Sequence, residues 1–402
     1  MLLSLLLRRA IKTGDLTLID ATGRTHRFGT AQQAPVVTVR LHDAALHRKL
    51  ITNPELHAGE AYMDGSLTIE QGSLFDLLKL FGINQEQAPP LPGRRLARAL
   101  MPILRRAQQY NPIGRAKRNV AHHYDLSGEL YDLFLDADRQ YSCAYFTRPE
   151  DTLEQAQEDK KRHIAAKLRL EPGMRVLDIG CGWGGLALYL ARIADVEVVG
   201  VTLSEEQLKV ARQRAEDAGL ADRVSFRLQD YREDRGSYDR IVSVGMFEHV
   251  GVGHYGEFFA QVRRLLRPQG VALLHAIGRV DGPGTTNAWL RKYIFPGGYA
   301  PALSEVVPVI EKSALWITDI EILRLHYALT LQEWHRRFQA NRDKIAKLYD
   351  ERFCRMWEFY LIGAEVDFRY LGTMVFQIQM TKDIAAVPTV RDYMLDWERA
   401  HR

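Results

Sequence analysis

The residues best suited to chemistry lie in a glycine-rich turn near the middle of the chain. Residues 176–185 read VLDIGCGWGG, an apolar stretch that runs into glycines. Gly180 and Gly182 let the backbone turn tightly and approach a ligand closely. A turn of this kind also serves dinucleotides, but here Asp178 precedes the glycines, and Thr202 and Ser204 stand where a ribose-binding acid is expected. The pattern favours S-adenosylmethionine, a sulfonium cation without a pyrophosphate, over other nucleotides.

Other side chains carry weaker signals. Asp230 follows the third expected strand, where its carboxylate can accept from an adenine amino group, although a loop carboxylate without that role is an equally good interpretation. Cys143 lies in no acyl-enzyme elbow, so covalent catalysis is not expected. His122 and His123 have no carboxylate at ligand spacing, so no metal site is predicted.

Alternating strands and helices must position the glycine turn. Strand patterns occupy 175–179, 196–201, 238–244 and 271–276, and helical patterns occupy 186–193 and 204–218. Strands separated by helices predict an α/β fold with a doubly wound, Rossmann-like parallel sheet. Residues 368–380 are a further strand candidate, which we expect at the sheet edge.

The leading residues predict a smaller α+β domain. Residues 36–41 alternate as a strand does, and 73–80 have the spacing of a short amphipathic helix. We expect an N-terminal lipid- or substrate-binding domain at 1–88, a basic linker at 89–118 and a catalytic domain at 119–402. A purely structural leading domain is an equal alternative.

The expected linker is strongly basic. Between residues 89 and 119 there is no acidic residue, and apolar residues alternate with eight cationic ones, namely Arg94, Arg95, Arg98, Arg105, Arg106, Arg115, Lys117 and Arg118. A basic amphipathic stretch can lie in the headgroup plane of an anionic bilayer, and a solvated linker is the alternative. Nucleic acid is not an expected partner, because no recognised reader motif accompanies the charges.

Composition places the chain in a broad class. Its 402 residues are 46% hydrophobic and 26% charged, as in an ordinary globular protein of more than one domain. Three widely spaced cysteines make no disulfide framework and favour a reducing compartment. Residues 1–7 are apolar but too short to span a membrane, and Arg8 and Arg9 follow them, which is the wrong order for a signal peptide. We expect a cytoplasmic protein that reaches lipid from one side.

Six short motifs occur in order along the chain: HYDLS at 123–127, YSCAYF at 141–146, the glycine turn at 177–185, VTLS at 201–204, FEHVG at 247–251 and FPGG at 295–298. Together they resemble the cyclopropane-fatty-acyl-phospholipid synthase family, which is similar to the mycolic acid cyclopropane synthases. The resemblance covers 118–402. GEAYMDG at 59–65 is similar to the N-terminal domain of the bacterial phospholipid enzymes, which the mycolic enzymes lack.

The resemblance implies an S-adenosylmethionine-dependent methyltransferase sheet and a transfer of methylene to a membrane phospholipid with cis-unsaturated acyl chains. It also implies a homodimer, in peripheral contact with the inner membrane face. By position, it implies cofactor contacts at Tyr141, Ser142, Gly180, Gly182, Thr202 and Gln207, to which the local pattern adds Asp178 and Asp230. It implies a bound bicarbonate among Cys143, Glu248, His275, Ile277 and Tyr327.

The implied chemistry gives these residues roles. Methylation of an alkene leaves a carbocation, and ring closure then removes a proton from the new methyl group. Bicarbonate can take that proton without capturing the cation. His275, Tyr327 and the backbone near Cys143 and Ile277 would donate to it, and Glu248 would accept from its hydroxyl.

The cation must also be kept from water. Aromatic faces stabilise a cation without reacting with it. Candidates for an aromatic acyl tunnel are Tyr141, Tyr145, Phe146, Trp289, Tyr293, Phe295 and Trp316, although core packing is the better interpretation of each one singly.

Alternative activities stay open. A fatty-acyl methyltransferase that leaves a methyl branch would share the fold, and a catalytically inactive lipid-binding protein would keep the fold as a scaffold. A methyltransferase for a soluble substrate would not need the leading domain or the basic stretch. The intact base site favours ring formation over a branch, and the intact glycines and Glu248 argue against an inactive scaffold.

Overall fold

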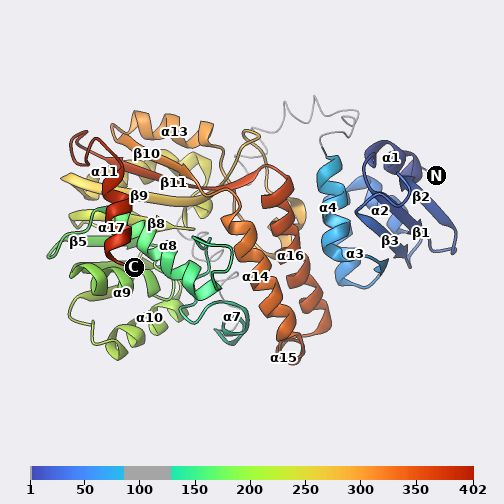
Figure 1. Cartoon of the computed structure of the whole chain (residues 1–402), viewed down its shortest axis with the longest axis horizontal. Helices are drawn as coiled ribbons and strands as arrows, with labels where there is room; N and C mark the ends of the chain where they lie inside the picture. Colours follow the sequence, from blue (N-terminus) through green and yellow to red (C-terminus); the bar gives the residue numbers. More distant parts are fainter. Residues whose placement is uncertain (1, 86–127) are drawn as a thin grey trace. The chain divides into compact units, whose positions relative to one another are not determined.

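The computed structural model describes residues 2–85 and 128–402 (Figure 1), and their contacts divide them into two compact units. Unit 1 contains residues 2–85, 285–296 and 328–372, and unit 2 contains 128–284, 297–327 and 373–402. The units are therefore discontinuous in sequence. The expected boundaries at 88 and 118 stay predictions, and the basic stretch 89–118, His122, His123 and the HYDLS motif lie outside the described residues.

Unit 1 combines a small sheet with helices. The sheet order is β2-β1-β3-β4, in which β1 and β3 are parallel and the outer pairs antiparallel. Its strands are β1 (Asp15–Ile19), β2 (Thr25–Gly29), β3 (Val36–Leu41) and β4 (Leu67–Gln71). Its helices are α1 (Leu2–Ala10), α2 (Leu46–Thr52), α3 (Pro54–Met63), α4 (Leu74–Asn84), α12 (Ala288–Tyr293), α15 (Arg342–Leu348) and α16 (Glu351–Tyr370). Helix α14 (His326–Ala340) lies in unit 1 except for its first two residues.

One apolar core joins the leading residues of unit 1 to its late helix. Ile362 and Val366 of α16 are buried in the same cluster as Val37 of β3 and Leu80 of α4. The predicted strand at 36–41 is β3, and the predicted helix at 73–80 is α4, which starts at a capping box on Ser73 and runs longer than expected. The α+β character of the leading residues is confirmed.

Unit 2 is built on one seven-stranded sheet with the order β10-β11-β9-β8-β5-β6-β7. Its strands are β5 (Arg175–Ile179), β6 (Glu197–Thr202), β7 (Val224–Leu228), β8 (Tyr238–Val244), β9 (Leu266–Arg279), β10 (Trp316–Ile322) and β11 (Thr373–Thr381). Its helices are α7 (Gly128–Phe134), α8 (Leu153–Leu168), α9 (Gly185–Ala194), α10 (Glu205–Asp217), α11 (Tyr255–Leu265), α13 (Leu303–Lys312) and α17 (Asp392–Ala400). Short 3-10 turns are η1 (Tyr231–Glu233), η2 (Phe247–His249) and η3 (Val252–His254). The predicted doubly wound α/β fold is confirmed.

Apolar residues on both faces of the strands explain why helices cover the sheet twice. Val176 and Val198 belong to the core shared with α8 and α9, whereas their neighbours Leu177 and Val199 belong to the core shared with α11 and α13. Because successive side chains of a strand point to opposite faces, an all-apolar strand must be covered on both sides. Figure 1 shows the two helical layers, α11 and α13 on one face and α8 and α9 on the other.

The C-terminal strand differs from the prediction. Residues 368–370 are the end of α16, and β11 begins only at Thr373. It pairs antiparallel with both β9 and β10, so it is an interior strand, and the expectation of an edge position is wrong. The edge strand on this side of the sheet is β10, which no sequence pattern predicted. Its Trp316 is 52% exposed, so core packing, the better single-residue interpretation, is wrong for this candidate tunnel aromatic.

Strand order sets the position of a ligand site. The parallel strands β5 and β6 pair on one side and β5 and β8 on the other, so the chain reverses its direction of winding beside β5. In open α/β sheets, ligands bind at the carboxyl ends of the strands at such a switch point. Among the helices of the described residues, none combines the length and the hydropathy that crossing a bilayer requires.

Candidate functional site

Two adjoining pockets open at the carboxyl ends of β5, β6 and β8. The first, called the polar pocket, is lined by Tyr141, Ser142, Lys160, Asp178, Trp183 and neighbouring residues. The second, called the loop pocket, is lined by Thr202, Leu203, Asp230, Met246, His249 and their neighbours. Gly180, Gly182 and Gln207 line both pockets, so the two form one continuous site around the glycine turn.

The glycines at the centre of the site are required by backbone geometry. Gly180 has a φ of +84°, and a Cβ there would lie 2.8 Å from the Cβ of Met246. Gly182 has a φ of +54° with open space around its missing Cβ. Positive φ is strained for other residues, so at Gly180 both strain and contact exclude a side chain. The open space at Gly182 leaves the backbone accessible to a ligand.

Hydrogen bonds at the start of α10 orient Gln207 toward the site. The Ser204 hydroxyl accepts from the backbone N–H of Gln207 at 3.3 Å, which caps the helix. The Thr202 hydroxyl donates to Gln207 Oε1 at 3.0 Å and accepts from the Ser204 amide at 3.2 Å. The Gln207 oxygen is thus engaged, which leaves its Nε2 hydrogens as the donors for a ligand.

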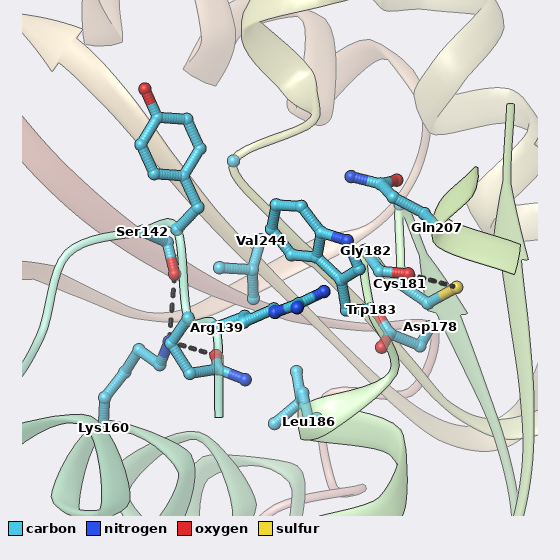
Figure 2. A pocket seen from close by; sticks show the side chains of 15 residues that line it. Arg139, Ser142, Lys160, Asp178, Cys181, Gly182, Trp183, Leu186, Gln207 and Val244 are labelled. Atoms are coloured by element: carbon cyan, nitrogen blue, oxygen red, sulfur yellow. Dashed lines mark hydrogen bonds between the residues drawn. The ribbon is translucent and has the colours of Figure 1, made fainter. Parts of the chain in front are cut away.

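Opposite charges are buried in the polar pocket. Figure 2 shows Lys160 reaching from α8 to Ser142, with Asp178 across the pocket. Lys160 Nζ donates to Gln140 Oε1 at 2.5 Å and to Ser142 Oγ at 2.9 Å. Burial raises the pKa of Asp178 to about 7, against the opposing charge of Lys160, and its Oδ2 has no hydrogen-bond partner among the described residues. A cationic ligand would supply the missing charge.

Asp230 is already engaged. Its carboxylate accepts from Arg232 Nε at 2.8 Å and from Arg232 Nη2 at 2.7 Å, and from the Arg232 amide at 3.0 Å. The residue lines the loop pocket, as expected for an adenine contact. Carboxylate oxygens have further lone pairs, so Asp230 can still accept one more donor while Arg232 holds it in place.

Next to the pockets, Glu248 forms a second polar centre. It lies on η2, two residues after the pocket residue Met246. The Ile277 amide donates to Glu248 Oε1 at 2.6 Å, whereas Oε2 is buried and has no partner among the described residues. Burial raises the pKa of Glu248 to about 7, although the hydrogen bond from Ile277 favours ionisation. The Ile277 amide was expected to donate to bicarbonate, but in this structure it is taken by Glu248.

His275 lies two residues before Ile277 on β9, in register with the pocket residue Val244. Only 2% of its surface is exposed. Burial, together with the positive charges of Lys160, Lys167 and His163, lowers its pKa to about 3. Its ring is therefore neutral at physiological pH.

Cys143 and Tyr327 complete the set expected around bicarbonate. Cys143 follows the pocket residue Ser142, and burial raises the pKa of its thiol, so it is not a ready nucleophile. Tyr327 is 7% exposed at the start of α14. The preceding residue, His326, accepts from the Phe146 amide at 3.1 Å, which holds this turn against the YSCAYF segment.

The structure gathers the predicted cofactor residues. All eight, namely Tyr141, Ser142, Asp178, Gly180, Gly182, Thr202, Gln207 and Asp230, line one or both pockets. None of the five residues expected around bicarbonate lines them, although Glu248 and Ile277 are bonded to each other. The binding roles of both sets stay predictions.

Of the expected tunnel aromatics, Tyr145 stacks between His163 and His326, at centroid distances of 4.2 and 4.6 Å. Trp289 is buried in unit 1, where its Nε1 donates to Met63 Sδ at 3.2 Å. Both side chains are held by packing, as the single-residue interpretation expected.

Sequence reasoning missed Lys160 and Gln140, and it gave His249, the neighbour of Glu248, a structural role. Lys160 is 1% exposed and anchors the segment that carries Ser142. His249 lines the loop pocket, and burial lowers its pKa to about 4. The position of Gln140 beside the YSCAYF motif was the one available signal. A lysine in a helix as charged as α8 gives none.

Comparisons with known proteins agree with this geometry. Residues 113–378 match the family model described as mycolic acid cyclopropane synthetase, and residues 9–88 match a domain of unknown function, DUF7884. The chain is 39% identical over 348 residues to the cyclopropane-fatty-acyl-phospholipid synthase of Escherichia coli K12, which covers 86% of this chain and 88% of that protein. It is 37% identical over 369 residues to a probable fatty acid methyltransferase of Pseudomonas putida, over 88% and 89% of the two chains.

A solved structure extends the comparison to a bound ligand. Mycolic acid cyclopropane synthase CmaA1, complexed with SAH and CTAB, superposes with a TM-score of 0.63 at 35% identity. The match covers 67% of this chain and 98% of that one.

Proposed function

The chain belongs to the mycolic acid cyclopropane synthetase family, and from that premise we propose that it converts a cis double bond in a phospholipid acyl chain into a cyclopropane ring. The enzyme is an S-adenosylmethionine-dependent methyltransferase. S-adenosylmethionine supplies the methylene carbon as an electrophilic methyl group.

The observation that carries the proposal is the buried carboxyl of Glu248. Methyl transfer to a nucleophilic oxygen or nitrogen releases at most the proton already on that atom, but ring closure must remove a proton from the transferred methyl group itself. An enclosed carboxyl with one bonded and one unpartnered oxygen, next to the pocket wall, supports such a step. With a pKa near 7, it can exchange a proton at physiological pH.

The residue types at Glu248, His275 and Tyr327 fit a small oxyanion such as bicarbonate. The unpartnered Oε2 can share a proton with a bicarbonate hydroxyl, and a neutral imidazole at His275 and a phenol at Tyr327 are donor types that an anion requires. The bicarbonate would supply a base too small and too well held to capture the carbocation. The Ile277 amide can join this set only where Glu248 releases it.

The phospholipid substrate is supported by two features. The Escherichia coli relative carries that substrate class in its name, and its match covers 86% of this chain. The match to DUF7884 at 9–88 falls on the leading domain, for which we propose substrate binding, with the basic linker in contact with anionic headgroups. We further propose a homodimer in peripheral contact with the inner membrane face.

A second candidate is a fatty-acyl methyltransferase that leaves a methyl branch. The name of the Pseudomonas putida relative favours it, at 37% identity. The two activities share the donor and the lipid, and differ only in the fate of the cation.

The deciding experiment incubates the full-length protein with S-adenosylmethionine, labelled in its methyl group, and vesicles of cis-unsaturated phospholipid. The fatty acids are then released and separated by mass and by their response to mild acid. We expect label in a ring that acid opens. Label in an acid-stable branched chain would establish the second candidate, and unlabelled lipid would reject both.

The contribution of bicarbonate is tested in the same assay with buffers depleted of carbon dioxide. Turnover should fall on depletion and return when bicarbonate is added. Ring formation that is indifferent to depletion would remove bicarbonate from the proposal and leave Glu248 as the direct base.

A further inference from the structure

A chain of hydrogen bonds lies behind His275, on the side of the ring that carries Nδ1. Gln377 of β11 pairs with His275 of β9, and its Nε2 lies 3.1 Å from His275 Nδ1. Lys167 of α8 donates from Nζ to Gln377 Oε1 at 2.6 Å. Lys167, Gln377 and His275 are at most 2% exposed, so no bulk water competes for these bonds.

Lys167 determines which end of the Gln377 amide faces His275. An ammonium group donates three hydrogen bonds and accepts none. The amide oxygen must therefore face Lys167, and the amide NH2 must face the imidazole. A reversed amide would place donors against the ammonium group and leave the carbonyl oxygen on His275.

The amide in turn determines which ring nitrogen carries the proton. Because Gln377 Nε2 donates, His275 Nδ1 must accept and bears no hydrogen. A neutral imidazole then has its hydrogen on Nε2. The other ring nitrogen, Nε2, has no hydrogen-bond partner among the described residues.

We propose that Lys167 and Gln377 are positioning residues that hold His275 as the neutral tautomer with its hydrogen on Nε2, so that the ring is a permanent donor to the bound anion. This inference rests on the proposed function for its purpose, but the tautomer itself follows from the hydrogen bonds alone. A fixed donor stabilises an anion without reorganising during the reaction.

A neighbouring carboxylate, Glu321, favours the protonated form of Lys167. Lys167 Nζ also donates to Glu321 Oε2, which accepts from His163 Nε2 at 2.7 Å. His163 Nδ1 lies 2.5 Å from Glu398 Oε1. Burial disfavours the charge on Glu321, but the hydrogen bonds and charges of His163 and Lys167 outweigh it and lower the Glu321 pKa to about 2. Burial lowers the pKa of Lys167, and the charge and hydrogen bond of the ionised Glu321 oppose this shift and favour the protonated ammonium group.

Neutrality of the ring completes the argument. Burial and the cations Lys160, Lys167 and His163 all disfavour an imidazolium at His275, and the pKa near 3 reflects this. A charged ring would carry a hydrogen on both nitrogens and would repel the NH2 of Gln377. The neutral ring donates through Nε2 without offering an acidic proton beside a carbocation.

The tautomer can be read directly in the full-length protein, free of ligands, by nitrogen NMR of 15N-labelled histidines. The His275 signals are identified by their loss in a His275→Gln variant. We expect a protonated Nε2 and an unprotonated Nδ1 in the wild type. Protonation at Nδ1, or at both nitrogens near neutral pH, would overturn the proposal.

Gln377→Glu reverses the donor. A carboxylate can accept from Lys167 but cannot donate to His275, so we expect the hydrogen to move to Nδ1 and turnover to fall about 100-fold, which is typical for the loss of one positioned donor. The affinity for S-adenosylmethionine, measured by calorimetry, should stay unchanged. A hydrogen that remains on Nε2 with normal turnover would contradict the proposal.

The matched control is Gln379, two residues along the same strand. Its side chain is 1% exposed and also bonds to α8, with Nε2 donating to the Lys167 carbonyl at 2.5 Å, but within the described part of the chain it makes no hydrogen bond to the ring of His275. Gln379→Glu should cost stability as Gln377→Glu does, while the His275 tautomer stays that of the wild type. An equal effect on the tautomer would show a general structural role and refute positioning by Gln377.

Failure of the proposed function gives a different result. A protein that forms no ring but shows the Nε2 tautomer, and its switch in Gln377→Glu, would reject the lipid reaction and retain the positioning of His275. Ring formation with the wrong tautomer would do the reverse.

Discussion

Asp178 and Lys160 show how a single buried site can shift two pKa values toward neutrality. Burial raises the pKa of Asp178 to about 7 and lowers that of Lys160 to about 8. Each group is disfavoured in its charged form because water is excluded. A ligand that brings its own positive charge to Asp178 therefore changes the protonation of the site as it binds.

The affinity for S-adenosylmethionine should rise with pH. In the free protein, Asp178 is protonated below its pKa of about 7. The cationic ligand favours the carboxylate, so binding at pH 6 should release a proton, and affinity should grow by up to about tenfold per pH unit until pH 7. Calorimetry in buffers with different ionisation enthalpies measures the released proton. Asp178→Asn should bind weakly and show no such slope, whereas Glu248→Gln should keep it. A slope that persists in Asp178→Asn would assign the proton to another group.

Glu248→Gln should lose activity and gain stability. The glutamine side chain can still accept from the Ile277 amide, but it cannot exchange a proton, so ring formation should fall by about 10²–10⁴-fold.

The folded protein holds the Glu248 proton up to a pKa near 7, above the ordinary value of 4.5. The unfolded chain binds fewer protons in this window, so the wild type loses stability as pH rises from 4.5 to 7. In denaturant unfolding, the free energy of unfolding of the variant minus that of the wild type should be larger at pH 8 than at pH 5. A variant with normal turnover would dismiss Glu248 from the reaction.

At the scale of elements, α8 is the part of the site that is least apparent from its composition. Lys160, His163 and Lys167 lie on one side of this helix, three and four residues apart, and each is at most 7% exposed. A stripe of this spacing usually faces solvent. Here it faces Ser142, Glu321 and Gln377, so it links the polar pocket to the residues behind His275.

The first turn of α10 should transmit a local change to cofactor binding. Ser204→Ala removes the cap that accepts from Gln207, at a cost of about 1 kcal/mol. Because Gln207 lines both pockets, the affinity for S-adenosylmethionine should fall as well. Ser73→Ala is the matched control, since it removes the cap of α4 in unit 1. Unfolding experiments should show equal losses of stability in the two variants. Calorimetry should show a loss of affinity in Ser204→Ala alone. Equal affinities of the two variants for S-adenosylmethionine would show that the α10 cap has no effect on cofactor binding.

At the scale of the whole molecule, sequence order and spatial organisation diverge. Unit 1 takes in 285–296 and 328–372 as well as the leading residues, and its core includes Ile362 and Val366 from α16. A leading domain cut out of the chain would leave these apolar side chains without their partners. Studies of lipid binding therefore need the full-length protein.

Binding to membranes should depend on the basic stretch, which lies outside the described residues. Exchange of Arg94, Arg95 and Arg98 for serine should weaken binding to anionic vesicles by about 100-fold, at roughly 1 kcal/mol for each cation. Lysine at the same positions should preserve binding, because the charge is kept. Flotation of vesicles at two salt concentrations measures both effects. If the serine variants bind vesicles as the wild type does, the membrane contact must lie on another surface of the protein.

The clustering of the candidate cofactor residues was predictable because it depends on local sequence. The glycine turn follows β5, Thr202 ends β6 and Asp230 lies two residues beyond β7, and the carboxyl ends of these parallel strands meet at one edge of the sheet. The expected strands at 175–179 and 238–244 match β5 and β8, since runs of apolar, β-branched residues determine a buried strand on their own.

Tertiary structure alone decided the rest. Whether β11 is an edge or an interior strand depends on its pairing with β10, which its own residues do not encode. From the sequence, the Ile277 amide was expected to donate to a bound anion, whereas in the fold it donates to Glu248. Lys167 and Gln377, 210 residues apart, determine the proton of His275 only because packing excludes water from all three. Sequence determines which groups can donate and accept, but long-range packing selects the partner of each one.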